Sequence, residues 1–163
     1  MKVKTAHFGE VEVSEDNIYK AVAPVPGFPD SSQFFFIERD KIKPFRWLQS
    51  VEDENLTFVV VEPSNFFHDY DPKFGAFDLK QIGITRQEDT LIMAIVVLPD
   101  DLAKMTANLR GPLIINPKTK LFKQVFIETD RWTVRESIVE GIKRKERAAI
   151  EQQKQKQKNT GTT

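Results

Sequence analysis

The chain has 163 residues, a mass of 18.8 kDa and a formal net charge of zero at neutral pH. A hydrophobic fraction of 40% with 13 phenylalanines predicts one folded domain that buries roughly two thirds of its unfolded surface, and it excludes an intrinsically disordered chain. The sequence has no cysteine, which excludes disulfides, thiolate metal ligands and a cysteine nucleophile.

Short apolar runs separated by turn residues dominate the chain, and such runs predict strands. The expected strands are, in chain order, residues 3–8, 11–13, 17–23, 34–38, 45–51, 56–61, 91–98, 113–115, 123–128 and 132–135. The first two should form a hairpin around Gly9 and Glu10. The run 91–98 has no polar face, so it predicts the central strand of the fold, buried on both faces.

Helical signals are confined to two places. One helical turn is expected at residues 77–82, ended by Gly83, inside an irregular region. Residues 136–150 have apolar side chains near one helical face, although Gly141 weakens this helix. From residue 151 onward no apolar residue follows, and we expect a frayed or disordered tail.

This order of elements predicts the fold class. Many short strands without repeated helical crossovers are typical of an antiparallel barrel or closed sandwich. We therefore predict an all-β protein with a small antiparallel barrel-like domain over residues 1–137. A C-terminal helix and a Lys/Gln-rich flexible tail should occupy residues 138–163.

The most tightly specified loop is residues 108–112. Asn108 tolerates left-handed backbone angles, Gly111 needs no room for a Cβ atom, and Pro112 fixes its own φ. A short apolar strand follows and ends at Asn116, which precedes a proline. A shaped loop between buried strands favours a recognition role.

Charge is unevenly distributed along the chain. Residues 140–163 carry an excess of four basic side chains, so the preceding body carries an equal excess of acidic ones. An acidic body repels phosphate, which argues against direct nucleic-acid binding by the folded domain and favours a basic partner. The alternative is that these acidic residues only keep the protein soluble.

Catalytic and metal-binding patterns are weak. His68 lies among carboxylates, and a serine–histidine arrangement with Ser50 or Ser64 is conceivable, but no nucleophile elbow surrounds either serine. The sequence has no glycine-rich phosphate loop, and we expect neither metal nor cofactor. A small hydrolase using His68, or a nucleic-acid binder acting through the basic tail, remain the alternative functions.

We expect a cytoplasmic protein that does not enter a membrane. The charged start of the chain is not followed by an apolar signal segment. The longest apolar run, 91–98, is far shorter than the roughly 20 residues that a membrane helix requires.

Several short motifs occur together in a characteristic order. They are Pro26-Gly27-Phe28, the run PFRWLQSV at 44–51, FVVVEP at 58–63, Asp69-Tyr70, and TANLRGPLIIN at 106–116 with Gln124. With this order and spacing, the sequence resembles the flagellar assembly factor FliW family from about residue 8 to residue 127. The pair formed by Leu48-Gln49-Ser50 and the 106–116 block is the most specific part of the match.

The resemblance implies a non-enzymatic protein with a small barrel-like fold. Members of the family bind cytoplasmic flagellin and also bind CsrA, an RNA-binding translational regulator. Newly made flagellin draws the family member away from CsrA, which then represses flagellin translation. Export of flagellin frees the family member to inhibit CsrA.

Two sets of residues are the candidates for such recognition. Exposed aromatic, acidic and loop residues are predicted to contact partners, and the core is the alternative location for the aromatic ones. This contact set is Phe66, Phe67, Asp69, Tyr70, Asp71, Glu88, Asp89, Asn108 and Arg110. The set that shapes loops is Gly27, Gly111, Pro112 and Asn116.

Overall fold

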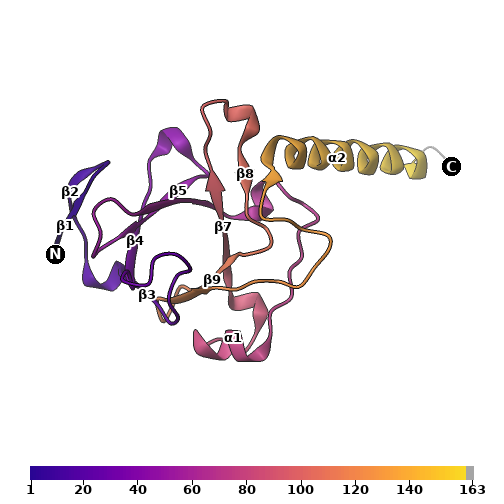
Figure 1. Cartoon of the computed structure of the whole chain (residues 1–163). Coiled ribbons are helices and arrows are strands. Elements are labelled where there is room, and N and C mark those ends of the chain that lie inside the picture. The colour runs from indigo at the N-terminus through magenta and orange to yellow at the C-terminus, as the bar shows by residue number, and fades with distance from the viewer. Residues whose placement is uncertain (161–163) are drawn as a thin grey trace.

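A closed barrel of seven strands forms the body of the protein (Figure 1). The computed structural model describes the backbone of residues 1–160 and the side chains of residues 1–158. Around the barrel run β7 (Leu91–Val97), β6 (Thr57–Val61), β5 (Arg46–Ser50), β4 (Gln33–Ile37), β3 (Tyr19–Ala21), β10 (Leu121–Gln124) and β9 (Leu113–Asn116), and β9 pairs back with β7. Only the β10–β3 pairing is parallel among these strand pairs. The predicted all-β, mostly antiparallel barrel is confirmed.

Strand β7 closes the barrel. Its first residues pair with β9, and Ala94 to Val96 pair with β6. Its end pairs with the short strand β8 (Thr106–Ala107), which in turn pairs with β11 (Glu136–Ser137). The predicted central strand is therefore present.

The prediction that residues 91–98 are buried throughout is wrong at the end of the run. Val97 is 59% exposed and Leu98 is 49% exposed. Side chains alternate between the two faces of a strand, so Val97 shares the inward direction of Met93 and Ile95. Val97 lies beyond the end of the barrel core, where no interior remains to bury it.

Apolar side chains cover both faces of the barrel wall. The interior is filled by residues from all sides of the barrel, among them Phe34, Leu48, Met93, Leu113 and Phe122. Three further clusters lie outside the barrel. They pack under the N-terminal hairpin, under α1 (Ala76–Gln81), and under α2 (Ile138–Thr160) with the segment after β6. Burial on both faces explains why the strands are continuously apolar.

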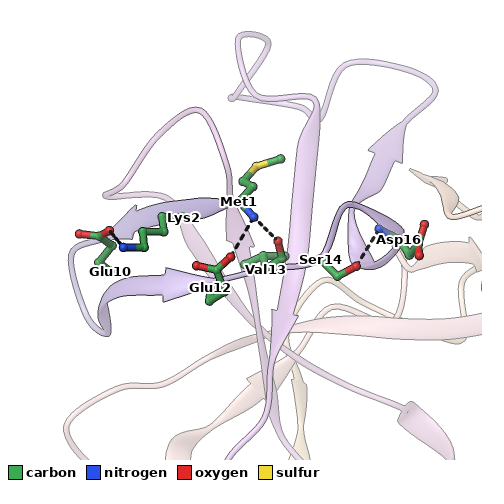
Figure 2. Close-up of polar contacts among 7 residues, drawn as sticks. All are labelled: Met1, Lys2, Glu10, Glu12, Val13, Ser14 and Asp16. Carbon is green, nitrogen blue, oxygen red and sulfur yellow. Dashed lines mark hydrogen bonds and ion pairs between the residues drawn. The ribbon is translucent and has the colours of Figure 1, made fainter.

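The N-terminal hairpin of β1 (Lys2–Thr5) and β2 (Gly9–Glu12) forms a separate two-stranded sheet. The predicted hairpin is confirmed, but its turn lies at residues 6–8, and Gly9 pairs with Thr5. In Figure 2 the Met1 ammonium group contacts the Glu12 carboxylate at 3.1 Å and donates to the Val13 carbonyl oxygen at 3.0 Å. A Lys2–Glu10 ion pair of 3.9 Å joins the two strands, and the Ser14 hydroxyl accepts a hydrogen bond from the Asp16 amide (Figure 2).

Several predicted elements have different bounds. The 77–82 turn is confirmed as α1, and Gly83 follows it with φ of 79°. The expected strand at 123–128 is β10, which begins and ends earlier. The expected strand at 132–135 is wrong, because these residues form a loop in which Trp132 is buried. Single 3-10 turns occur at Glu15–Asn17, Asp40–Ile42, Pro63–Asn65, Gln87–Asp89 and Leu102–Lys104.

Helix α2 is longer than predicted and projects from the barrel (Figure 1). It continues ten residues past Ile150 to Thr160, so the expected disorder from residue 151 is wrong for this part, and residues 161–163 lie outside the described residues. Lysine, glutamine and glutamate are good helix formers, which explains a helix without an apolar face here. Among residues 1–160, no helix is both long and apolar enough to cross a membrane.

Gly141 allows α2 to lie against the segment after β6. A Cβ atom at this position would lie 2.6 Å from Cε1 of Phe67 and 2.9 Å from the Phe66 carbonyl oxygen. Such distances are too short for real contacts, so only glycine permits this packing. The residue that weakens the helix in isolation is the residue that lets it dock.

Gly141→Ala tests this close approach. In an exposed helix the change would stabilise by about 1 kcal/mol. Here we expect a loss of about 1–3 kcal/mol in the free energy of unfolding, because Phe67 or the helix must move. Urea unfolding of Gly141→Ala, Phe67→Leu and the double variant gives the measurement. The added methyl group should cost less in the Phe67→Leu background, and a more stable Gly141→Ala protein would contradict the packing.

Val96→Asp and Val97→Asp test the burial pattern of β7. Val96 is 6% exposed, so its replacement buries an unpaired carboxylate and should cost about 3–5 kcal/mol. Its neighbour Val97 is largely exposed, so the same change there should cost under about 1 kcal/mol. Thermal and urea unfolding of both variants gives the comparison, and equal losses would refute the burial of Val96 and the exposure of Val97.

Candidate partner-binding surface

Hydrogen bonds on every side hold the loop at residues 108–112. The Asn108 amide donates to the Ile95 carbonyl oxygen at 2.9 Å, and its side-chain Oδ1 accepts from the Gly111 amide at 2.8 Å. Gln124 Nε2 donates to the Gly111 carbonyl oxygen at 2.9 Å, and the Ile127 amide donates to that of Arg110 at 2.9 Å. The loop is thus fixed by β7 on one side and by residues 124–127 on the other.

The conformation of this loop differs from the predicted one. Neither Asn108 nor Gly111 has positive φ. Asn108 acts instead through its side chain, which closes a turn onto Gly111. Gly111 is needed for space: a Cβ atom there would lie 3.0 Å from both Gln124 Nε2 and Phe126 Cε1.

The segment after β6 lies beside this loop. The Tyr70 hydroxyl donates to the Leu109 carbonyl oxygen at 2.7 Å. The Tyr70 ring meets Trp132 edge to face, with centroids 5.2 Å apart. We call residues 108–112, together with Asp69, Tyr70 and Arg131, the loop surface.

The two phenylalanines of this segment pack against the protein itself and are not free to contact a partner. Phe67 is 1% exposed and packs in the cluster under α2, so its predicted exposure is wrong. Phe66 is half-buried and stacks on Phe45 with centroids 5.5 Å apart. The sequence predicts an irregular backbone here, which suggested that the aromatic side chains are exposed. Helix α2 packs on this segment and buries them.

Most acidic candidates already have basic neighbours. Asp69 Oδ2 lies 3.1 Å from Arg131 Nη2, and its Oδ1 lies 3.8 Å from Arg144 Nη2. Asp71 pairs with Lys73 at 3.2 Å and Glu88 with Arg86 at 3.5 Å. Arg110 and Asp89 are exposed. The acidic surface predicted from charge counts is therefore partly neutralised, and most strongly at Asp69.

The other loop-shaping residues take structural roles. Gly27 has φ of 86° beside an isolated bridge between Val25 and Phe28, a backbone angle that favours glycine. Asn116 is buried, and its Nδ2 donates to the Ile82 carbonyl oxygen at 2.8 Å. Pro112 is buried beside Gly111.

The groups considered for catalysis are separated or occupied. Ser50 is buried, and its hydroxyl lies 2.9 Å from that of Ser31 and accepts from the Asp53 amide. His68 is exposed, with Nδ1 3.9 Å from Asp69 Oδ1. Within the part of the chain that the structure describes, no group of three or more His, Cys, Asp or Glu side chains could hold a metal ion.

One apolar surface was not predicted from the sequence. A groove of about 330 Å³ opens on the outer face of the barrel. Leucines beside predicted turns were the available signal, because turns normally carry polar residues. We call this surface the apolar groove; it is lined by Lys41, Ile42, Lys43, Phe45, Trp47, Val59, Leu98, Leu102 and Met105.

Comparison with known proteins connects the barrel and both surfaces to a family. The family model described as "FliW protein" matches residues 2–138, which include every barrel strand, the loop surface and the apolar groove. The chain belongs to the FliW family. It is 39% identical over 145 residues to the flagellar assembly factor FliW of Alkaliphilus metalliredigens, covering 88% of this chain and 90% of that protein.

Further relatives agree with this assignment. The flagellar assembly factor FliW of Natranaerobius thermophilus is 37% identical over 92% of this chain and 100% of its own length. A crystal structure of the flagellar assembly factor FliW superposes with a TM-score of 0.79 at 30% identity, covering 85% of this chain and 96% of that chain. The barrel of this FliW family member is therefore the fold of a solved relative.

Ionisation of Tyr70 tests the burial of the loop surface. Burial raises the pKa of the Tyr70 hydroxyl above its ordinary value. Unfolded tyrosine ionises near pH 10, so above about pH 10 the folded state retains a proton that the unfolded state loses, and stability falls as pH rises. This decrease of stability at high pH should be absent from Tyr70→Phe. The free energy of unfolding of that variant should also be lower by about 1 kcal/mol, because the hydrogen bond to Leu109 is lost.

Phenolate absorbance gives a direct measurement, because Tyr19 is the only other tyrosine. In Tyr19→Phe, the folded protein should ionise well above pH 10, and addition of urea should return the transition to about 10. A folded-state transition near 10 would show that Tyr70 is open to solvent.

Proposed function

We propose that this FliW family member binds flagellin in the cytoplasm and, when free of flagellin, binds and inhibits CsrA. The proposal is carried by the family match, which spans the whole barrel together with both surfaces. Relatives that carry the name flagellar assembly factor match over nearly their full lengths, which supports a role for the intact chain in flagellar assembly.

The chemistry of the loop surface supports recognition of a protein. Its backbone is held by hydrogen bonds, so little conformational entropy remains to be lost on binding. Arg110 lies exposed on this fixed loop. A rigid loop that presents an exposed side chain is suited to surface recognition.

Charge supports a basic second partner. A protein that binds RNA presents basic surface to phosphates, and acidic residues on an antagonist attract that surface and repel RNA. Several exposed acids of the described residues have no ion pair, and Glu54 and Asp89 are two of them. These two carboxylates are better steering candidates than Asp69, which is bound to arginines.

Titration of the full chain with purified monomeric flagellin, and separately with CsrA, tests the proposal. Calorimetry should detect both complexes, and added flagellin should release CsrA from a preformed complex. If wild-type protein binds no flagellin at any salt concentration, the proposed function is wrong.

Salt dependence distinguishes the two complexes. Association with CsrA should slow as salt increases, because the Debye length falls to about 8 Å at physiological ionic strength. The double variant Glu54→Lys, Asp89→Lys should slow CsrA association several-fold and leave flagellin binding unchanged. Thr85→Lys, at another exposed position, is the matched control for surface change. Equal salt slopes for the two partners would remove electrostatic steering from the mechanism.

A further inference from the structure

The outer face of the barrel wall is covered on two sides and open between them. On one side the N-terminal hairpin packs Phe8 against Trp47, with ring centroids 4.6 Å apart. On the other side Phe66 stacks on Phe45. The apolar groove lies between these covers, over β5 and β6.

Two loops form the walls of the apolar groove. One contains the 3-10 turn Asp40–Ile42, and the other is the β7–β8 loop, which projects beyond the barrel (Figure 1). Leu98 is 49% exposed and Leu102 is 60% exposed. Single exposed leucines are ordinary, but these two converge with Phe45, Trp47 and Met105 on one cavity, and such convergence marks an interaction site.

The strand pairing limits how a partner enters. Both β5 and β6 are paired along both edges, so no partner strand can be added there. A partner must therefore insert side chains. An amphipathic helix presents apolar side chains on one face at the spacing that a groove accepts.

The charged lining residues of the apolar groove are lysines. Lys43 pairs with Asp40 at 3.0 Å, whereas Lys41 has no ion pair in the described part of the chain. Lys104, Asp100 and Asp101 belong to the β7–β8 loop, and none of the three lines the cavity. The complementary partner is apolar at its centre and acidic along its edge.

We propose that the apolar groove binds the apolar face of an amphipathic helix whose edge carries acidic residues, and that this helix belongs to flagellin. The proposal deepens the proposed function and rests on it. Trp47 lines the floor of the groove, and a large aromatic residue in a desolvated pocket is typical of the residues that dominate binding energy.

Binding of purified monomeric flagellin to variants of the full chain tests the proposal. Leu98→Asp and Leu102→Asp place a charge in the groove at exposed positions and should each weaken flagellin binding at least about tenfold. Val134→Asp alters an exposed apolar residue outside the groove and should leave the affinity unchanged. Thermal unfolding of each variant separates a local effect from loss of the fold.

Two further measurements identify the occupant. In Trp132→Phe, which leaves Trp47 as the only tryptophan, the emission should shift to shorter wavelength when flagellin covers the groove. Lys41→Glu should weaken flagellin binding several-fold, while Lys41→Arg should preserve it. If Lys41→Glu binds flagellin as tightly as Lys41→Arg does, the proposed acidic edge of the partner helix is contradicted.

The outcomes separate the two proposals. If wild-type protein and both leucine variants bind flagellin equally, the groove proposal is overturned while the proposed function stands. If wild-type protein does not bind flagellin, both are overturned. If Leu102→Asp instead changes the sedimentation of the chain alone, the occupant is a second copy of this chain, which also overturns the assignment to flagellin.

Discussion

The pairing of β7 with β6, β9 and β8 is the constraint on which the rest of the structure depends. Without the β7–β9 pairing the sheet would have two free edges and no enclosed interior. The register is specified from both faces, because Met93 points into the barrel while Ala94 and Val96 point into the cluster under α2. A shift of the β7 pairing register by one residue would exchange these two faces and disrupt both apolar clusters.

Closure of the barrel creates a second requirement, because its outer faces are also apolar and must be covered. The N-terminal hairpin, the α1 region and α2 with the segment after β6 each cover one part. The α2 cover depends on Gly141, which brings the helix within contact of Phe67. The apolar groove is the part of the wall that these covers leave open. Its position is thus a consequence of the fold and not of one loop.

Local signals in the sequence predicted the barrel strands well, because long apolar runs and turn residues act within a few positions. The prediction failed where distant contacts decide. Trp132 lies in a loop and is buried by Phe67 and Tyr70, which are far away in sequence. The strand β8 has two residues, too few to give a periodic pattern. For the site, the sequence identified Tyr70 and the 108–112 loop as candidates, but their contact and the burial of Phe67 depend on how distant segments pack, including where α2 docks.

Formal charge, counted from the sequence, does not show which charges are neutralised by distant residues. The same distant contacts also distinguish the loop surface from the apolar groove. Asp69 counts as one negative charge in the sequence, yet two arginines from distant segments approach it. A partner that contacts Asp69 or Tyr70 therefore meets side chains that already have partners, so binding there exchanges one set of interactions for another. At the apolar groove the exposed leucines contact water, and a partner removes apolar surface without breaking an existing hydrogen bond. Affinity is therefore gained more easily at the groove, whereas the fixed geometry of the loop surface favours selectivity.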